Sequence, residues 1–179
     1  MKTFLTCLAA TLISLSAGAA WAQKSTRPTD PQIAALVDTA NQIDIDAGKL
    51  AKSTSQSKDV QQFAQQMITD HSAVNKSASE LATKLKVIPE LSIASAKLQK
   101  GGDDNIAALK KLQGHAFDQA YVDHEVAYHE AVIKMLDKIL IPDAKNTELK
   151  ALLVKVRPAF EAHLAHAIKL QAELARGAA

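Results

Sequence analysis

Histidines recur at helical spacing among apolar residues in three separate parts of the chain. His71 lies four residues after Met67, and His163 lies three residues after Phe160. At about 100° of rotation per residue, each of these two histidines points to the middle of an apolar helix face, and so does His124. Imidazole nitrogens in such positions can bind a metal ion or join a buried hydrogen-bond network.

Carboxylates and further histidines accompany these positions. Four polar residues follow one another by three or four positions and therefore share one flank of a helix: Asp118, Tyr121, Glu125 and His129. His166 follows His163 by three residues, so both can address one centre from one helix face. Asp44 sits at the edge of an apolar stripe, whereas Asp70 adjoins His71 but points about 100° away from it.

These polar residues allow two interpretations. An unpartnered buried polar group costs about 1–3 kcal/mol, so a single buried histidine is more often a core residue with one hydrogen-bond partner than a ligand. Core-facing histidines on three helices, with carboxylates on two, indicate either a polar network or a metal site inside a bundle. A shared ion requires ligand nitrogens within about 4–5 Å of one another, because each lies roughly 2 Å from the ion. Binding would then weaken below about pH 6, where histidine becomes protonated.

Four amphipathic segments can position these side chains. Apolar residues recur at intervals of three and four over residues 31–53, 57–86, 103–140 and 143–176, which predicts four helices. Asp30 is the expected N-cap of the first helix and Ser57 that of the second. The stretch 87–102 is a longer connection, in which 91–100 can form a short helix and the glycine pair 101–102 interrupts the chain. We therefore predict an all-α fold, a four-helix bundle with one long crossover.

The N-terminal residues have the pattern of an export signal. An apolar stretch at residues 5–20 is too short for a comfortable membrane span, and the small residues of "AWA" mark a cleavage site after Ala22. We expect residues 1–22 to be a signal peptide, residues 23–30 a disordered lead-in and residues 31–176 the bundle domain. The mature protein would lie in the periplasm, without a transmembrane span.

Composition excludes several function classes. Cys7, the one cysteine in the sequence, falls in the expected signal peptide. The mature chain would therefore have no disulfide, no thiol nucleophile and no cysteine-based metal site. The formal net charge is only +2, and aromatic residues make up 4% of the chain. This is neither a basic footprint nor a stacking surface for bases, so we expect no nucleic-acid partner.

Four stretches of the chain share a pattern with a known family. They read "ANQIDIDAGKLA", "VQQFAQQMITDHSAVN", "GHAFDQAYVDHEVAYHEAVI" and "LIPDAKNTELKALLVKVRPAFEAHLAHA". Over about residues 31–173 the sequence resembles the bacterial exported proteins grouped as domain of unknown function 4142. The resemblance implies a ferritin-like four-helix bundle, and some members carry an outer-membrane label. It also implies polar core positions at Asp44, His71, Asp118, His129 and His163, which favours His129 over His124 as a site residue.

The chain departs from the ferritin-type di-iron site, which takes Glu-x-x-His from two helices and a glutamate from each of two others. The second predicted helix has Asp70 directly before His71, and Glu161 lies only two residues before His163. A set rich in histidine suits zinc, copper or nickel better than two irons. The candidate ligands of one divalent ion are therefore His71, His129, His163, Asp118, Asp44 and His166.

Three functions remain open. The first is a periplasmic bundle that binds one divalent transition-metal ion through core histidines. The second is a non-catalytic interaction or stress-protective protein whose polar core holds no metal. An enzyme acting at a metal ranks last, because the sequence shows neither an open coordination position nor a substrate channel. The partners that these functions allow are an envelope protein, the outer membrane or a second copy of the chain.

Overall fold

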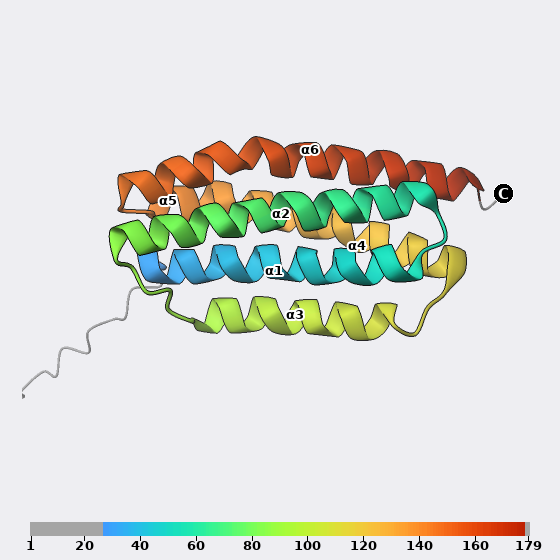
Figure 1. The fold of residues 1–179 in the computed structure, drawn as a ribbon, viewed down its shortest axis with the longest axis horizontal. Helices are drawn as coiled ribbons and strands as arrows, with labels where there is room; N and C mark the ends of the chain where they lie inside the picture. The colour runs from blue at the N-terminus through green and yellow to red at the C-terminus, as the bar shows by residue number, and fades with distance from the viewer. Residues whose placement is uncertain (1–26, 178–179) are drawn as a thin grey trace, which may run out of the picture.

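The computed structural model describes residues 27–177, and every regular element in that range is helical. Figure 1 shows long helices lying side by side along one axis, with their connections at the two ends. The predicted all-α class is confirmed, since residues 27–177 contain no strand. The expected signal peptide and the first residues of the expected lead-in lie outside the described residues.

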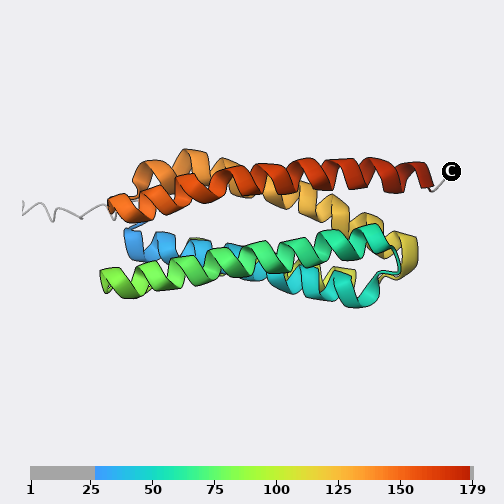
Figure 2. The same cartoon turned by 45° about the horizontal axis from the view of Figure 1, so that its top comes forward.

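The chain forms one layer of helices against another. The elements follow in the order α1 (Asp30–Thr54), α2 (Lys58–Leu85), α3 (Ile93–Leu109), α4 (Gly114–Met135), the π-helical turn η1 (Leu136–Leu140), the short α5 (Ile141–Asp143) and α6 (Thr147–Gly177). α1 lies between α2 and α3, and α6 packs against both α2 and α4 (Figures 1 and 2). Ser57 is the N-cap of α2 as predicted, and its hydroxyl accepts the backbone N–H of Val60.

The start of α1 differs from the prediction. Thr29 rather than Asp30 is the N-cap, and it forms a reciprocal capping box with Gln32. Asp30 lies in the first turn, where its carboxylate accepts the backbone N–H groups of Lys145 and Asn146 at 2.8 Å. Asp30 therefore ties the beginning of α1 to the turn before α6, a contact between residues far apart in the sequence.

The predicted third helix is wrong at its beginning. Residues 103–109 belong to α3, which begins at Ile93 and continues through the glycine pair. Gly102 is buried against α1, and a Cβ there would lie 2.6 Å from Cγ1 of Ile43. The close approach of two helices, rather than a break in one, explains this glycine. The break comes at residues 110–113, directly before α4, whose first residue Gly114 has a φ of +56° that favours glycine.

The same predicted helix also ends later than residue 140. After α4 the helix widens into η1, where the N–H of Ile141 bonds to the carbonyl five residues earlier, and helical structure continues to Asp143. Pro142 lies at the start of this last helical turn, where its missing N–H is tolerated. α6 then begins at Thr147, four residues later than predicted.

The core consists of two apolar clusters at different levels along the bundle. The first includes Leu36, Tyr128, Val132, Leu153 and Phe160. The second includes Phe63, Met67, Phe117, Tyr121 and Leu170. Within residues 27–177, none of the helices combines the length and the hydropathy needed to span a lipid bilayer.

Buried polar residues lie where one apolar cluster gives way to the other. Each of four long helices contributes at least one, for example Asp44 on α1, His71 on α2, Glu125 on α4 and His163 on α6. On α1, for example, Ile43 belongs to the first cluster and Ala47 to the second. The bundle therefore contains a polar layer between two apolar levels.

Candidate metal centre

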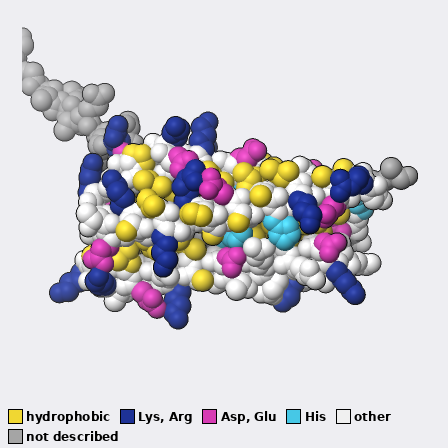
Figure 3. All heavy atoms as spheres, turned by 90° about the horizontal axis from the view of Figure 1, so that it is seen from above, with side chains coloured by type: hydrophobic (Ala, Val, Ile, Leu, Met, Phe, Trp, Pro, Cys, Tyr) yellow, Lys and Arg dark blue, Asp and Glu magenta, His cyan; other side chains and the backbone are white. Residues whose placement is uncertain are grey.

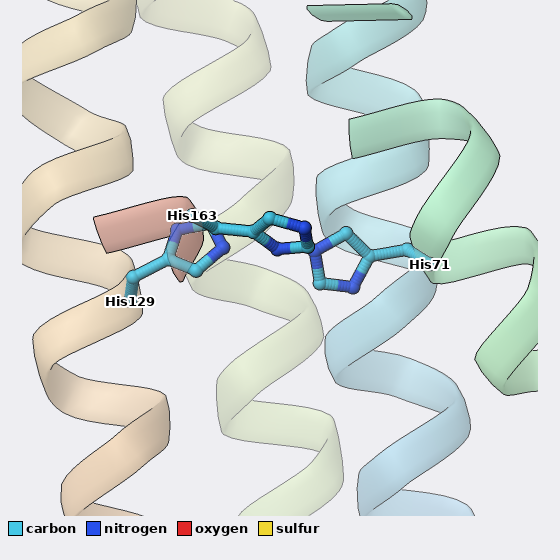
Figure 4. Close-up of side chains that lie close together, drawn as sticks. All are labelled: His71, His129 and His163. Carbon is cyan, nitrogen blue, oxygen red and sulfur yellow. The ribbon is translucent and has the colours of Figure 1, made fainter. Parts of the chain in front are cut away.

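His71, His129 and His163 meet inside this polar layer. They come from α2, α4 and α6, and Figure 4 shows their rings next to one another between the helices. The ring centroid of His71 lies 5.7 Å from that of His129 and 5.2 Å from that of His163. The centroids of His129 and His163 are 5.5 Å apart. One ring nitrogen from each residue lies within 4.8 Å of the others. This spacing falls in the range of about 4–5 Å expected of nitrogens that bind one ion.

Hydrogen bonds decide which ring nitrogen carries the proton in two of these histidines. His71 Nδ1 lies 2.8 Å from Oδ1 of Asn41, whose amide nitrogen donates to Asn75. His129 Nδ1 lies 2.9 Å from the backbone carbonyl oxygen of Glu125. Both oxygens can only accept, so Nδ1–H donates in each ring and Nε2 has the free lone pair.

His163 is held through Nε2 instead of Nδ1. Its Nε2 lies 2.9 Å from Oδ2 of Asp70, so Nε2–H donates to the carboxylate and Nδ1 has the free lone pair. The remaining nitrogens are buried and have no hydrogen-bond partner within residues 27–177: His71 Nε2, His129 Nε2 and His163 Nδ1. Metal-binding histidines usually donate their other ring N–H to an oxygen acceptor, and all three rings have this arrangement.

Asp44 and Glu125 form a second group with His129. One carboxylate oxygen from each and one nitrogen of His129 lie within 4.8 Å of one another. Both carboxyl groups are fully enclosed and interact with each other, and within residues 27–177 no other group donates a hydrogen bond to their four oxygens. Asp44 Oδ2 also approaches His71 Nε2 to 3.4 Å. The two groups are therefore continuous, and five side chains surround one small volume.

Burial controls the protonation of these five groups. It raises the pKa of Asp44 to about 8, and burial together with the charge of Asp44 raises the pKa of Glu125 well above its usual value. Burial and the neighbouring imidazoles lower the pKa of His71 well below its usual value. Burial also lowers the pKa of His129 to about 4 and lowers that of His163. At neutral pH the rings are neutral, and the carboxyl groups hold protons unless a cation is near.

The charges at this centre suit a cation. Within residues 27–177, the ion-pair partners of Asp44 and Glu125 are His71 and His129, and no lysine or arginine pairs with either carboxylate. Three neutral nitrogens and two ionisable carboxyl groups could surround a divalent ion and leave the interior electrically neutral.

Two of the predicted ligands lie outside both groups. Asp118 is buried, but it precedes Glu125 by seven residues, which is about 10 Å along a helix. His166 lies one turn beyond His163, and its Nδ1 lies 3.0 Å from Oε1 of Gln66. Both residues are on the predicted helices but at a different level, so the structure does not bring them to the centre.

His124 is also outside the centre, as the family resemblance implied. Its ring stacks on that of Tyr128, with centroids 5.5 Å apart and planes inclined by 19°. The side chain is half-buried, and burial lowers the pKa of its imidazole. A packing role at the edge of the core accounts for its position in the apolar stripe.

Three residues that form the centre or hold its histidine rings are missing from the predicted ligand set. Glu125 could have been chosen, because it precedes His129 by one helical turn on the same flank. Nothing in the sequence around Asn41 indicates that its side chain accepts a hydrogen bond from His71. Asp70 points away from the apolar face of α2, and only the packing of α6 brings His163 to its carboxylate.

The fold and the site together define a class: an all-helical protein with a layer of buried histidines and carboxyl groups between two apolar clusters. The chain belongs to the family described as a domain of unknown function (DUF4142), whose model matches residues 15–170. The resemblance inferred from the four sequence stretches is thereby confirmed. Comparisons with curated proteins and with solved structures found no match.

Proposed function

We propose that this protein is an exported helical-bundle protein that binds one divalent transition-metal ion in its polar layer. His71, His129 and His163 supply the nitrogen ligands, and Asp44 and Glu125 complete the coordination or balance its charge. Zinc, copper and nickel are the preferred ions, because neutral imidazole suits these late first-row metals.

The convergence of three unpartnered imidazole nitrogens carries this proposal. His71 Nε2, His129 Nε2 and His163 Nδ1 are buried without a hydrogen-bond donor, while each opposite N–H is already held by an oxygen. A single water molecule has two O–H groups, so on its own it would leave at least one of the three lone pairs without a donor. One metal ion can accept all three lone pairs at once.

Charge and hydrogen bonding favour one ion over two. Ionised Asp44 and Glu125 supply two negative charges, which balance one divalent ion but not a pair. His129 cannot bridge two ions, because its Nδ1–H is held by the carbonyl oxygen of Glu125. A single centre with up to five ligands therefore fits better than a di-iron pair, which takes four glutamates in ferritin-like proteins.

For the fold, we propose a ferritin-like four-helix bundle of α1, α2, α4 and α6, with α3 in the long crossover. The signal-peptide pattern of residues 1–22 supports a periplasmic or exported location, and the outer-membrane label of some family members is compatible with association there. The five groups at the centre are at most 2% exposed, which favours metal binding over catalysis on a diffusing substrate. An envelope protein or a second copy of the chain is compatible with this role as a partner.

A metal-free polar network is the second candidate. It is favoured by the approach of Asp44 Oδ2 to His71 Nε2 at 3.4 Å. Because burial raises the pKa of Asp44 to about 8, its carboxyl proton could be donated to that nitrogen at neutral pH. The protein would then be a non-catalytic interaction or stress-protective protein, and a His71→Ala substitution would change its stability but not its metal content.

Metal analysis of the untagged protein, purified from the periplasm, separates the two candidates. We expect about one equivalent of a divalent metal per chain, and its loss in the His71→Ala and His129→Ala variants, since each removes a ligand. His115→Ala is the matched control, because His115 is exposed on α4. Less than about 0.2 equivalents in the wild-type protein, even after incubation with Zn(II), Cu(II) or Ni(II), would contradict metal binding.

A further inference from the structure

We infer that the surface between α2 and α6, at Asp70 and His166, is where a divalent ion is captured and passes into the polar layer. This inference rests on the proposed metal binding, since it concerns how the same centre is filled. An enclosed centre needs an access route, because the ion must exchange its water for ligands that solvent does not reach. The five groups around this centre are at most 2% exposed.

Asp70 connects the buried centre to solvent. Its side chain is 41% exposed, and its carboxylate accepts the Nε2–H of His163, which is buried. The groups that hold the other two rings are Asn41 and the backbone of Glu125, both of which belong to buried residues. An ion bound to the Asp70 carboxylate is therefore separated from the centre by a single imidazole ring.

A second polar contact crosses the same two helices one turn away. His166 Nδ1 lies 3.0 Å from Gln66 Oε1, and both residues are partly exposed. The amide oxygen can only accept, so His166 Nδ1–H donates and its Nε2 has a free lone pair. Gln66 precedes Asp70 by four residues and His166 follows His163 by three, so the two contacts occupy adjacent turns.

These two contacts offer an arriving ion suitable ligands. A carboxylate, an amide oxygen and an imidazole nitrogen all bind divalent first-row metals. Figure 3, which views the molecule from the side of α6, shows histidine side chains reaching the surface near the middle of the long axis, with an acidic side chain beside them. The surface between α2 and α6 thus combines negative charge with nitrogen ligands next to the centre.

Two neighbouring interfaces are closed by contacts with a backbone carbonyl group. The hydroxyl of Tyr128 on α4 donates to the carbonyl oxygen of Ala40 on α1 at 3.0 Å. α1 and α2 approach so closely at Gly48 that a Cβ there would lie 2.9 Å from the carbonyl oxygen of Ala64. By contrast, α2 and α6 meet at this level through polar side chains, which can move aside without a shift of the backbone.

Passage of the ion requires one side-chain movement. The ion first binds the Asp70 carboxylate and His166 Nε2 at the surface. Rotation of the His163 ring away from Asp70 then opens the path to His71 and His129. Return of the ring restores its hydrogen bond to Asp70 and places Nδ1 on the ion. The capture step at the surface limits the rate of uptake as long as this rotation is faster than the arrival of the ion.

The rate of Zn(II) uptake by the metal-free protein, measured by stopped flow with a chromophoric zinc indicator, tests this route. We expect Asp70→Asn to slow uptake by up to roughly 30-fold at low ionic strength, the effect of one unit charge about 4 Å from a divalent ion in water. The dependence of the rate on salt should weaken as well, since salt screens that charge. The asparagine oxygen can still accept the N–H of His163, so the orientation of the ring is kept.

His166→Ala should also slow uptake, while zinc affinity at equilibrium stays within about twofold, because His166 does not contact the final centre. Glu80→Gln and His115→Ala are the matched controls, since both side chains are exposed away from this surface, and each should take up zinc at the wild-type rate. Wild-type rates in Asp70→Asn and His166→Ala would overturn the inference. A change confined to the dissociation rate would also overturn it, since Asp70 would then only support His163.

Equilibrium zinc binding by the wild-type protein is measured before the rates. If the wild-type protein binds no zinc, the proposed function fails, and the access route fails with it. If it binds zinc but the four variants all take up the ion at the same rate, the centre stands and only the route is wrong.

Discussion

A single hydrogen bond decides the direction of each imidazole lone pair in this protein. Asn41, the backbone carbonyl of Glu125 and Asp70 each hold one ring N–H. The opposite nitrogens consequently face the interior, where the described part of the chain offers them no hydrogen-bond partner. Burial lowers the pKa values of the three rings and keeps them neutral, so their lone pairs stay available for a cation at neutral pH.

The carboxyl groups, rather than the imidazoles, set the pH dependence that we expect for metal binding. Burial raises the pKa of Asp44 to about 8 and that of Glu125 well above its usual value. Both groups therefore hold a proton at neutral pH and must lose it to face a cation. Affinity should fall as pH is lowered below about 8, by up to ~100-fold per pH unit where two protons are displaced.

This expectation replaces the value of about pH 6 that ordinary histidine titration suggests. Zinc dissociation constants at pH 6, 7 and 8, measured against a chelator of known protonation, provide the check. The Asp44→Asn variant has only one carboxyl proton to release on binding, so its affinity for zinc should change by only ~10-fold per pH unit. Constant affinity from pH 8 to 7, with weakening only below pH 6, would assign the protons to the histidines instead.

At the scale of elements, the close approach of helices decides which side chains reach the polar layer. α3 packs on α1 at Gly102, and α1 packs on α2 at Gly48, both without room for a Cβ. Ile43, which covers Gly102, is the direct neighbour of Asp44 on α1. The crossover helix therefore helps to hold α1 in the position that brings Asp44 to the centre.

Gly102 and Gly101 offer a matched pair of substitutions in α3. The Cβ of a Gly102→Ala variant would lie 2.6 Å from Cγ1 of Ile43, so we expect a loss of about 1–3 kcal/mol in the free energy of unfolding. The Cβ of a Gly101→Ala variant has nothing within 4 Å, so a gain of about 0.5–1 kcal/mol should follow from better helix propensity. Urea unfolding followed by circular dichroism measures both changes. Equal effects at the two positions would argue against the packing of α3 on α1.

At the scale of the whole molecule, the candidate centre joins four helices that are far apart in the sequence. Its side chains come from α1, α2, α4 and α6, so the complete ligand set exists only in the folded chain. An ion bound there would stabilise the folded state by mass action. Metal binding and thermal stability are therefore two measurements of one property.

Free zinc at about 100 times its dissociation constant should stabilise the folded protein by about 2.7 kcal/mol. For a domain of this size, that corresponds to a rise in Tm of about 5–10 °C. Thermal unfolding followed by circular dichroism, with and without zinc, gives the shift, and excess EDTA should reverse it. His71→Ala should show no shift. An unchanged Tm in the wild-type protein would speak against a centre formed on folding.

Much of this protein is predictable from sequence because it depends on order within one helix. Apolar spacing predicts the all-α class, and Ser57 caps α2 as predicted. The motifs point to the family, and periodicity with the family pattern selects the three histidines that meet, His71, His129 and His163. The third helix was predicted with wrong ends, because the fit of Gly102 against Ile43 has no local signature.

Only the tertiary structure decides which polar residues share a level. Asp118 and Glu125 stand on one flank of α4, but the packing of α4 on α1 brings Glu125, not Asp118, next to Asp44. Asp70 points away from the core face of its own helix, and α6 supplies its partner His163. The physical reason is that helical periodicity sets the direction of a side chain around one axis. How far one helix slides or turns against another depends on side-chain packing along the whole interface.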